Sequence, residues 1–325
     1  MFRFRVFKFR AVATVAFCVL APWQASASAG YIFKTIDPPG PIGFSIALGV
    51  NNAGQAVGTA LDADFNTTAF LHSNGVSAFL SVPGAVSGSE AVGINNAGTI
   101  VGDYDDANFK VHGFILQGGN FLPFTPPGTV NGSTATGVNA LGVVVGNSVD
   151  ANNNKASYTL SGGVYSPINS GFKGSTVQGI NNAGDIVGSF SDSHTHGIGF
   201  VIHEGVTTAI RVQGADYTFA NGINNAGTIV GDYTTDIGSS GFLLSGEGFT
   251  TIQYPGSAAT EIYGINDSGT IVGDYSDADG NVHSFIATSV PEPSSALLAG
   301  LAIPLIAVYA RRKRTGLART KLAGL

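Results

Sequence analysis

Two glutamates, Glu90 and Glu261, are the residues of this sequence that could do acid and base chemistry together. Each lies three residues before the first glycine of a repeated motif. The other copies of the motif have different residues at that position: Ile46, Thr134, Thr176 and Phe219. One carboxyl group can protonate a leaving oxygen while another activates water, as in most glycoside hydrolases. The two glutamates therefore define a catalytic hypothesis, and a solvated channel rim is the alternative interpretation.

A second candidate site is a loop rich in hard oxygen ligands. Asp277, Asp279 and Asn281 alternate with Ala278 and Gly280, and Ca²⁺ prefers carboxylate and amide oxygens of this kind. The full twelve-residue calcium loop with its terminal glutamate is absent, and Asp, Asn and Gly are also the residues of ordinary tight turns. Ca²⁺ is thus the only cofactor that the sequence suggests, with turn formation as the alternative.

The histidines indicate structure more than metal binding. His112 and His283 recur beside the phenylalanine that begins a strand, which favours a repeated structural hydrogen bond. His194 and His196 could contribute to a metal site, but the sequence offers no third ligand for them.

The motif that positions these residues is the decapeptide GINNAGTIVG at residues 93–102, which occurs six times in related forms. Its copies begin 44, 44, 42, 43 and 42 residues apart, and such a period indicates a repeat architecture. In each copy an asparagine is followed three residues later by glycine, which predicts a type I turn between two apolar strands. The repeated unit therefore contains a β-hairpin.

Four short apolar segments recur in fixed order in each unit, which predicts a four-stranded antiparallel meander. The last unit lacks its fourth segment, whereas residues 31–37 are an isolated copy of that segment at the start of the chain. We therefore predict an all-β fold: a six-bladed β-propeller over residues 30–288, closed by the N-terminal strand. An open solenoid of stacked units is the alternative.

Consecutive strands alternate in direction, so the loops after the second strand of each unit are expected on one face. These loops carry mostly acidic and amide residues: Asp62, Asp64, Asn66, Asp103, Asp105, Asp106, Asn108, Asp150, Asn152, Asp192, Asp232, Asp236, Asp274, Asp277, Asp279 and Asn281. We predict a ring of carboxylates on this face, which would be the contact surface of the protein.

Charge is unevenly distributed along the 325 residues. Ten of the fifteen Lys and Arg residues lie in the first ten and last fifteen positions, and five remain between residues 30 and 290. That middle region holds twenty of the twenty-one acidic residues. It would repel a phosphate backbone, which excludes nucleic acid as a partner.

Residues 1–29 have the three parts of a secretory signal peptide. A basic start precedes an apolar run over residues 11–22, and small residues at 25–29 suit cleavage. The sole cysteine and the sole tryptophan, Cys18 and Trp23, lie in this segment. The exported protein is therefore predicted to contain no disulfide.

The repeated unit resembles the HAF family of extracellular repeats found in bacterial secreted proteins. The resemblance rests on the decapeptide followed by His112-Gly113-Phe114, or by His-Ser-Phe at residues 283–285, and it extends over nearly the whole middle of the chain. It implies secretion and no established activity.

Residues 289–325 closely resemble a PEP-CTERM sorting signal. Pro291, Glu292 and Pro293 precede an apolar run at 296–310 and a basic cluster at 311–314. The resemblance implies transient insertion of a C-terminal helix in the inner membrane, processing by an exosortase, and release to the surface or matrix of a bacterium. The apolar run is about 22 Å long as a helix, short of the ~30 Å hydrocarbon core, so a permanent single-pass anchor is the weaker alternative.

These features together predict a secreted or cell-surface, non-enzymatic repeat protein that serves as a binding or structural component of an extracellular polysaccharide matrix. The alternative is a polysaccharide-acting hydrolase or lyase with its site at the channel mouth. Glu90 and Glu261 would be its acid and base.

Overall fold

The computed structural model describes residues 30–39, 43–192 and 197–290. The chain divides into two compact units, Met1–Thr288 and Ser289–Leu325, and the description below concerns the first. Its described residues form 24 β-strands and no helix. The strands fall into six successive groups of four, which we number 1 to 6.

The strands of groups 1 to 3 follow one another in chain order. Group 1 comprises β2 (Ser45–Val50), β3 (Ala56–Leu61), β4 (Thr67–Ser73) and β5 (Val76–Phe79). Group 2 comprises β6 (Ser89–Ile94), β7 (Ile100–Asp105), β8 (Val111–Gln117) and β9 (Asn120–Phe124). Group 3 comprises β10 (Ser133–Val138), β11 (Val144–Val149), β12 (Lys155–Ser161) and β13 (Val164–Ile168).

Groups 4 and 5 continue this order, and group 6 combines both ends of the unit. Group 4 comprises β14 (Thr176–Ile180), β15 (Ile186–Ser191), β16 (Gly197–His203) and β17 (Val206–Ile210). Group 5 comprises β18 (Tyr217–Ile223), β19 (Ile229–Thr235), β20 (Gly238–Ser245) and β21 (Gly248–Ile252). Group 6 comprises β22 (Ala259–Ile265), β23 (Ile271–Ser276), β24 (Val282–Ser289) and β1 (Tyr31–Thr35).

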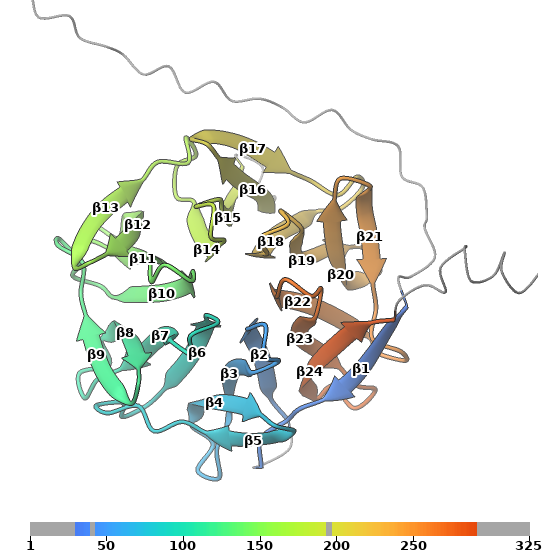
Figure 1. Cartoon of the computed structure of the whole chain (residues 1–325), viewed down its shortest axis with the longest axis horizontal. Helices are drawn as coiled ribbons and strands as arrows, with labels where there is room; N and C mark the ends of the chain where they lie inside the picture. The colour runs from blue at the N-terminus through green and yellow to red at the C-terminus, as the bar shows by residue number, and fades with distance from the viewer. Residues whose placement is uncertain (1–29, 40–42, 193–196, 291–325) are drawn as a thin grey trace, which may run out of the picture. The chain divides into compact units, whose positions relative to one another are not determined.

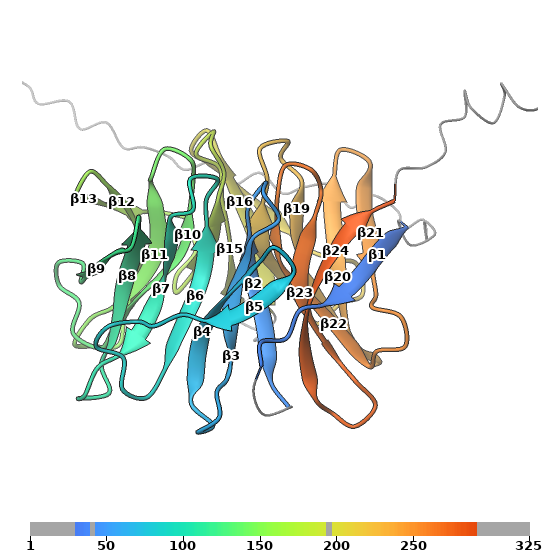
Figure 2. The same ribbon diagram turned by 60° about the horizontal axis from the view of Figure 1, so that its bottom comes forward.

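Each group is an antiparallel sheet whose strands pair in chain order, except that β1 pairs with β24 at the outer edge of group 6. A single parallel residue pair, Gly197 with Tyr217, joins the sheets of groups 4 and 5. The sheets surround a common axis, with the first strand of each group innermost (Figure 1). Turns connect the strands at both faces of this arrangement (Figure 2). Radial four-stranded sheets of this kind make a β-propeller, which confirms the all-β propeller prediction.

The hydrophobic core lies between neighbouring sheets. One apolar cluster, for example, combines Val57 and Ala69 of group 1 with Ile94 and Phe114 of group 2. Five of the six third strands carry a phenylalanine that is almost fully buried: Phe70, Phe114, Phe200, Phe242 and Phe285. A sheet cannot bury such side chains alone, so each group depends on its neighbours.

A ring of buried asparagines links the turns between first and second strands. The side-chain Nδ2 of Asn51 donates to the backbone carbonyl of Asn95 (3.2 Å). The same bond continues from group to group until Asn266 donates to the carbonyl of Asn51 (2.9 Å). Its six members are Asn51, Asn95, Asn139, Asn181, Asn224 and Asn266. Each Oδ1 also accepts backbone N–H groups of its own turn, as Asn95 does from Ala97 and Thr99.

The innermost strands approach one another through the first glycine of each motif. A Cβ placed on Gly49 would lie 2.7 Å from the carbonyl oxygen of Val92 and 3.1 Å from the Cα of Gly93. A Cβ on Gly264 would lie 2.9 Å from the carbonyl oxygen of Leu48. These distances leave no room for a side chain at Gly49 or Gly264, which explains why the motif begins with glycine in these copies.

Candidate functional site

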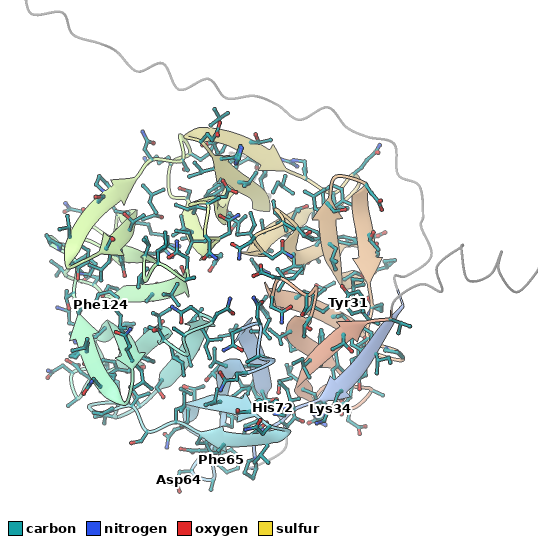
Figure 3. The ribbon with its side chains drawn as sticks, in the orientation of Figure 1. Tyr31, Lys34, Asp64, Phe65, His72 and Phe124 are labelled. Atoms are coloured by element: carbon teal, nitrogen blue, oxygen red, sulfur yellow. The ribbon has the colours of Figure 1, made fainter. Side chains whose placement is uncertain are left out.

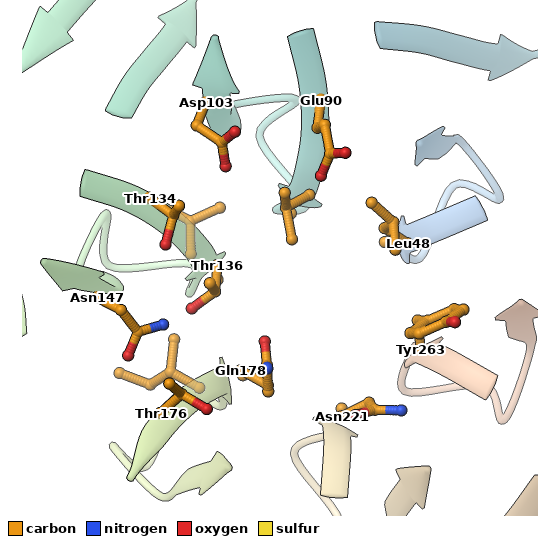
Figure 4. Close-up of a pocket in the computed structure, with 18 of the residues that line it drawn as sticks. Leu48, Glu90, Asp103, Thr134, Thr136, Asn147, Thr176, Gln178, Asn221 and Tyr263 are labelled. Atoms are coloured by element: carbon orange, nitrogen blue, oxygen red, sulfur yellow. The ribbon is translucent and has the colours of Figure 1, made fainter. Parts of the chain in front are cut away.

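The innermost strands enclose a central cavity of about 670 Å³. Figure 4 shows side chains from several sheets directed into it. Its polar lining includes Glu90, Asp103, Thr134, Thr136, Asn147, Thr176, Gln178, Asn221 and Tyr263. A concave site of this size with convergent polar groups is typical of small-molecule binding sites.

A β-bulge in each innermost strand supplies one ring of lining side chains. In group 1, Ala47 pairs with Gly58 and Gly49 pairs with Val57, so Leu48 between them has no partner. The same register shift occurs in all six first strands. The bulged residues are Leu48, Val92, Thr136, Gln178, Asn221 and Tyr263, and all six line the cavity. An extra residue re-aims its side chain out of the sheet, here toward the central axis.

This ring was missed in the sequence interpretation, although a signal exists. The residue before each motif glycine differs in every copy, from apolar Leu48 to amide Gln178 and phenol Tyr263, while the residues after it hardly change. Variable positions beside an invariant backbone motif are the expected signature of a binding surface carried by a fixed scaffold.

Glu90 and Asp103 form a pair of carboxyl groups on one wall of the cavity. They are direct partners across β6 and β7, and both line the cavity (Figure 4). Burial raises the pKa of Glu90, and the nearby charge of Asp105 adds to this. Burial also raises the pKa of Asp103 well above its usual range, with further contributions from Glu90 and Asp105. The pair therefore retains a proton more readily than exposed carboxyl groups do.

A second acidic cluster lies in groups 5 and 6. Glu261 is the cross-strand partner of Asp274, and the phenol of Tyr263 donates to Glu261 Oε2 (2.6 Å). Burial, assisted by the charge of Glu261, raises the pKa of Asp232 to about 7 and that of Asp274 to about 8. Asn221 Nδ2 donates to Asp232 (2.7 Å), whereas Asp274 Oδ1 is buried with no hydrogen-bond partner among the described residues.

The structure gives each of the two predicted catalytic glutamates an acidic partner in its own sheet. Glu90 pairs with Asp103 in group 2, and Glu261 pairs with Asp274 in group 6. Glu90 lines the cavity, but Glu261 is not among the described residues that line it. A single acid and base pair made of Glu90 and Glu261 is therefore less well supported than the pair of Glu90 with Asp103.

The predicted ring of loop carboxylates is partly wrong. Asp103 lies inside β7, Asp232 inside β19 and Asp274 inside β23, and Asp105 is the last residue of β7. These second strands continue through the positions that were assigned to the loops. Asp232 and Asp274 are each only 6% exposed, so they belong to the interior and not to the rim.

The predicted calcium ligands lie in the loop after β23, as expected. Asp277 Oδ1 accepts the backbone N–H groups of Asp279 and Asn281 (both 2.9 Å). Its Oδ2 accepts from the side chains of Asn281 (3.0 Å) and His283 (3.2 Å). These bonds, led by that from the Asn281 side chain, lower the pKa of Asp277 to about 2. The aspartate thus stabilises the turn, and calcium binding stays a prediction.

The structural role predicted for two histidines is confirmed. His112 bonds Asp106 Oδ2 (3.0 Å) and lies against Tyr104. His283 bonds Asp277 and also Asp37 Oδ2 (2.7 Å), just beyond β1. His194 and His196 lie outside the described residues. Within the described ranges, no three His, Cys, Asp or Glu side chains are grouped to hold a metal ion.

The predicted signal peptide and the sorting residues Pro291, Glu292 and Pro293 lie outside the described residues, as does the predicted C-terminal helix. None of the described residues belongs to a helix that could cross a membrane.

Comparison with solved structures gives distant matches. AofleA from Arthrobotrys oligospora is 12% identical, with a TM-score of 0.48 over 80% of this chain and 89% of that chain. The β-propeller domain of the Trilobed protease from Pyrococcus furiosus is 10% identical, with a TM-score of 0.47 over 73% and 79%. The Trypanosoma rangeli sialidase is 10% identical, with a TM-score of 0.49 over 83% and 61%.

No curated protein matches the chain. Residues 289–314 match the PEP-CTERM protein-sorting motif. This motif is a recognition signal for exosortase processing, and it indicates an exported protein with a cell-surface or extracellular location in a bacterium.

Proposed function

We propose that this chain is an exported, non-enzymatic protein that binds a polysaccharide of the bacterial cell surface or matrix. The observation that carries the proposal is the central cavity of about 670 Å³ with its hydroxyl, amide and carboxyl side chains. Groups of these types exchange hydrogen bonds with sugar hydroxyls. The cavity belongs to the size class of sites that enclose a small ligand, which suits a terminal sugar or a short segment of a glycan.

In this proposal the six groups are the blades of one ring, built from HAF repeats and closed by the N-terminal strand. The place of β1 beside β24 supports closure. So do the hydrogen bond from Asn266 to Asn51 and the close approach of Gly264 to Gly49. A closed ring exposes no long unpaired strand edge, which suits a protein that works outside the cell.

The sorting motif supports the proposed location. After removal of a signal peptide at residues 1–29, the C-terminal segment would hold the chain in the inner membrane until an exosortase processed it. The folded unit would then reach the surface or the polysaccharide matrix, where its ligand is found.

Calorimetry of the full-length protein with the exopolysaccharide of its bacterium tests the proposal. We expect saturable binding that Glu90→Gln together with Asp103→Asn weakens about tenfold, because the hydrogen bonds between these two carboxyl groups and sugar hydroxyls are lost. Asp236→Asn is the matched control, since Asp236 is an exposed acid in a loop outside the cavity. Equal binding by all three proteins would contradict a ligand site in the cavity.

The alternative function is cleavage of a polysaccharide by a hydrolase or lyase reaction, and the pair of Glu90 and Asp103 favours it. Two adjacent carboxyl groups with raised pKa values can divide the roles of acid and base. Release of new reducing ends from the same exopolysaccharide, abolished by Glu90→Gln, would establish it. Binding without release would support the non-enzymatic function.

Calcium could add to glycan binding at Asp277, Asp279 and Asn281. An ion there would have to replace the hydrogen bonds that Asp277 accepts from the backbone N–H groups of Asp279 and Asn281. The measurement is the thermal shift of the protein on addition of Ca²⁺, which Asp277→Asn should remove. No shift with the unsubstituted protein would end this part of the proposal.

A further inference from the structure

Four loops between second and third strands share one backbone turn. Each begins with an aspartate whose Oδ1 accepts the N–H groups two and four residues later: Asp62, Asp106, Asp150 and Asp277. The residue three positions after the aspartate has a left-handed conformation in every copy. These residues are Phe65 (φ 64°), Phe109 (φ 58°), Asn153 (φ 61°) and Gly280 (φ 85°).

Phenylalanine is an unfavourable choice for this conformation. Glycine adopts positive φ freely and asparagine tolerates it, whereas a bulky side chain there crowds the backbone. Phe65 is 71% exposed and Phe109 is 78% exposed, so neither ring gains packing that would offset the strain. Since Asn153 and Gly280 serve the same turn elsewhere, the fold supplies no reason for the two phenylalanines.

Each phenylalanine directly follows an exposed polar residue in the sequence. Asp64 precedes Phe65 and Asn108 precedes Phe109, and neither side chain is hydrogen bonded to another described residue. Asp64 and Phe65 lie at the outer rim of the ring of sheets (Figure 3). The two loops belong to neighbouring groups, so the same aromatic and polar combination occurs twice on one face.

We propose that Phe65 and Phe109 form a carbohydrate-binding surface, with each ring stacked on the apolar face of a pyranose. Asp64 and Asn108 would then hydrogen bond the sugar hydroxyls beside it. This inference rests on the proposed glycan-binding function, and it locates a second contact, outside the cavity, for a longer chain.

The surroundings of the two rings favour a sugar over lipid or protein. Exposed Asp64, Asn66 and Asn108 flank them, so each ring is a single apolar group among polar ones. A protein interface needs a contiguous apolar area of several hundred Å². Anionic lipid would be repelled by the carboxylates of Asp62 and Asp64 beside Phe65, whereas Asp106 and Lys110 carry opposite charges beside Phe109. A pyranose, which has both an apolar face and a rim of hydroxyls, matches the combination.

The test uses the full-length protein and three soluble glycans: cellohexaose, N-acetylchitohexaose and mannohexaose. In the Phe65→Asn, Phe109→Asn double variant we expect the affinity for the bound glycan to fall about tenfold. We also expect its melting temperature to rise, because asparagine relieves the left-handed strain. A variant that is more stable yet binds less cannot owe the loss to unfolding. Leu141→Asn is the control, since Leu141 is equally exposed (77%) in a turn at the opposite strand ends.

Unchanged affinity of the double variant would overturn the proposal. If Glu90→Gln reduced binding in the same assay, the glycan-binding function would stand and only this surface would be rejected. Absence of binding to all three glycans would count against both. If the protein instead bound vesicles of phosphatidylethanolamine and phosphatidylglycerol, or associated with a second copy, the double variant would show whether the two rings carry this property. Its loss in that variant would assign the rings to lipid or to self-association, and either result would overturn the proposal.

Discussion

Interior carboxyl groups are the residues whose chemistry departs most from what the sequence interpretation assumed. Asp103, Asp232 and Asp274 occupy one repeated position, two residues after the valine of their second strands. The other copies have Thr59, Asn147 and Ser189 there. An aspartate after glycine normally indicates a loop, and only the pairing register shows that the strand continues past it.

The raised pKa values of Asp232 and Asp274 predict a stability that falls with increasing pH. Both groups keep their protons in the folded protein up to pH values of about 7 and 8, whereas the unfolded chain releases them near pH 4. Their contribution to the free energy of unfolding is therefore full below about pH 4. It declines by up to about 1.4 kcal/mol per pH unit for each group and is lost as the pH rises through the pKa values of the folded protein.

Asp232→Asn should flatten this decline, because asparagine keeps an acceptor for Asn221 and has no charge to bury. Urea unfolding at pH 5 and pH 9 is the measurement, with Asp236→Asn as an exposed control. An identical pH dependence of the free energy of unfolding in Asp232→Asn and the unsubstituted protein would show that Asp232 is not protonated in the fold.

The contribution of the asparagine ring to stability can be tested with two adjacent residues, one buried in the ring and one exposed. Asn95 is 6% exposed, and its side chain makes three hydrogen bonds, to the carbonyl of Asn139 and to two N–H groups of its own turn. Asn95→Ala leaves these groups buried without partners and should cost roughly 2–4 kcal/mol of unfolding free energy. Asn96→Ala, at an exposed position, should cost roughly 1 kcal/mol or less. Chemical denaturation of the two variants compares them, and equal losses would argue against the ring as a stabilising network.

At the scale of elements, the repeat made the order of the strands predictable. The Asn and Gly of each motif, and the count of segments, indicated both the hairpins and the outer place of residues 31–37. The bulges were not predictable, because a register shift depends on pairing between strands and leaves no local turn signal. Only the variability of the position before the motif glycine could have pointed to Gln178 and Tyr263, because the bulge that directs them into the cavity has no local signal.

The contact of β1 with group 6 should depend on pH through His283. Burial lowers the pKa of this histidine, but hydrogen bonds with Asp37 and Asp277 outweigh it and raise the pKa overall. A histidine with a raised pKa stabilises the fold below its ordinary value of about 6.5, and the benefit is lost as the pH rises through the folded value. Hydrogen exchange should therefore show weaker protection of residues 31–36 at pH 8.5 than at pH 6, after correction for intrinsic rates.

His283→Gln should remove that difference in protection. His112→Gln is the matched control, since His112 holds the equivalent place in group 2 but has no contact with β1. If His112→Gln altered the protection of β1 as strongly as His283→Gln, the effect would not arise from the bond to Asp37.

For the whole molecule, the outer strand of group 6 is the one element contributed by a distant part of the chain. Phe33 packs against Phe285 and Tyr254, and the N–H of Ile36 donates to the carbonyl of Ser284 (3.0 Å). Deletion of residues 31–37 would expose the edge of β24 and the apolar side chains beneath it. Exposed strand edges pair with other chains.

We expect the deleted protein to form dimers or larger assemblies, which light scattering after size exclusion would detect. A synthetic peptide of residues 31–37 should restore the monomeric elution of the deleted protein. A deleted protein that stays monomeric and equally stable would show that β1 is dispensable for the edge.

The asparagine ring also bears on where the chain can begin. Every Nδ2 donates to the carbonyl of the next asparagine in the same rotational sense. The hydrogen bonds of the asparagine ring are therefore alike in all six groups and do not mark any group as the first or the last. The two ends of the described fold meet only at the periphery, where β1 pairs with β24. Circular permutants that join Thr288 to Tyr31 through a short linker, and that have their new termini in another outer loop, should keep the asparagine ring intact.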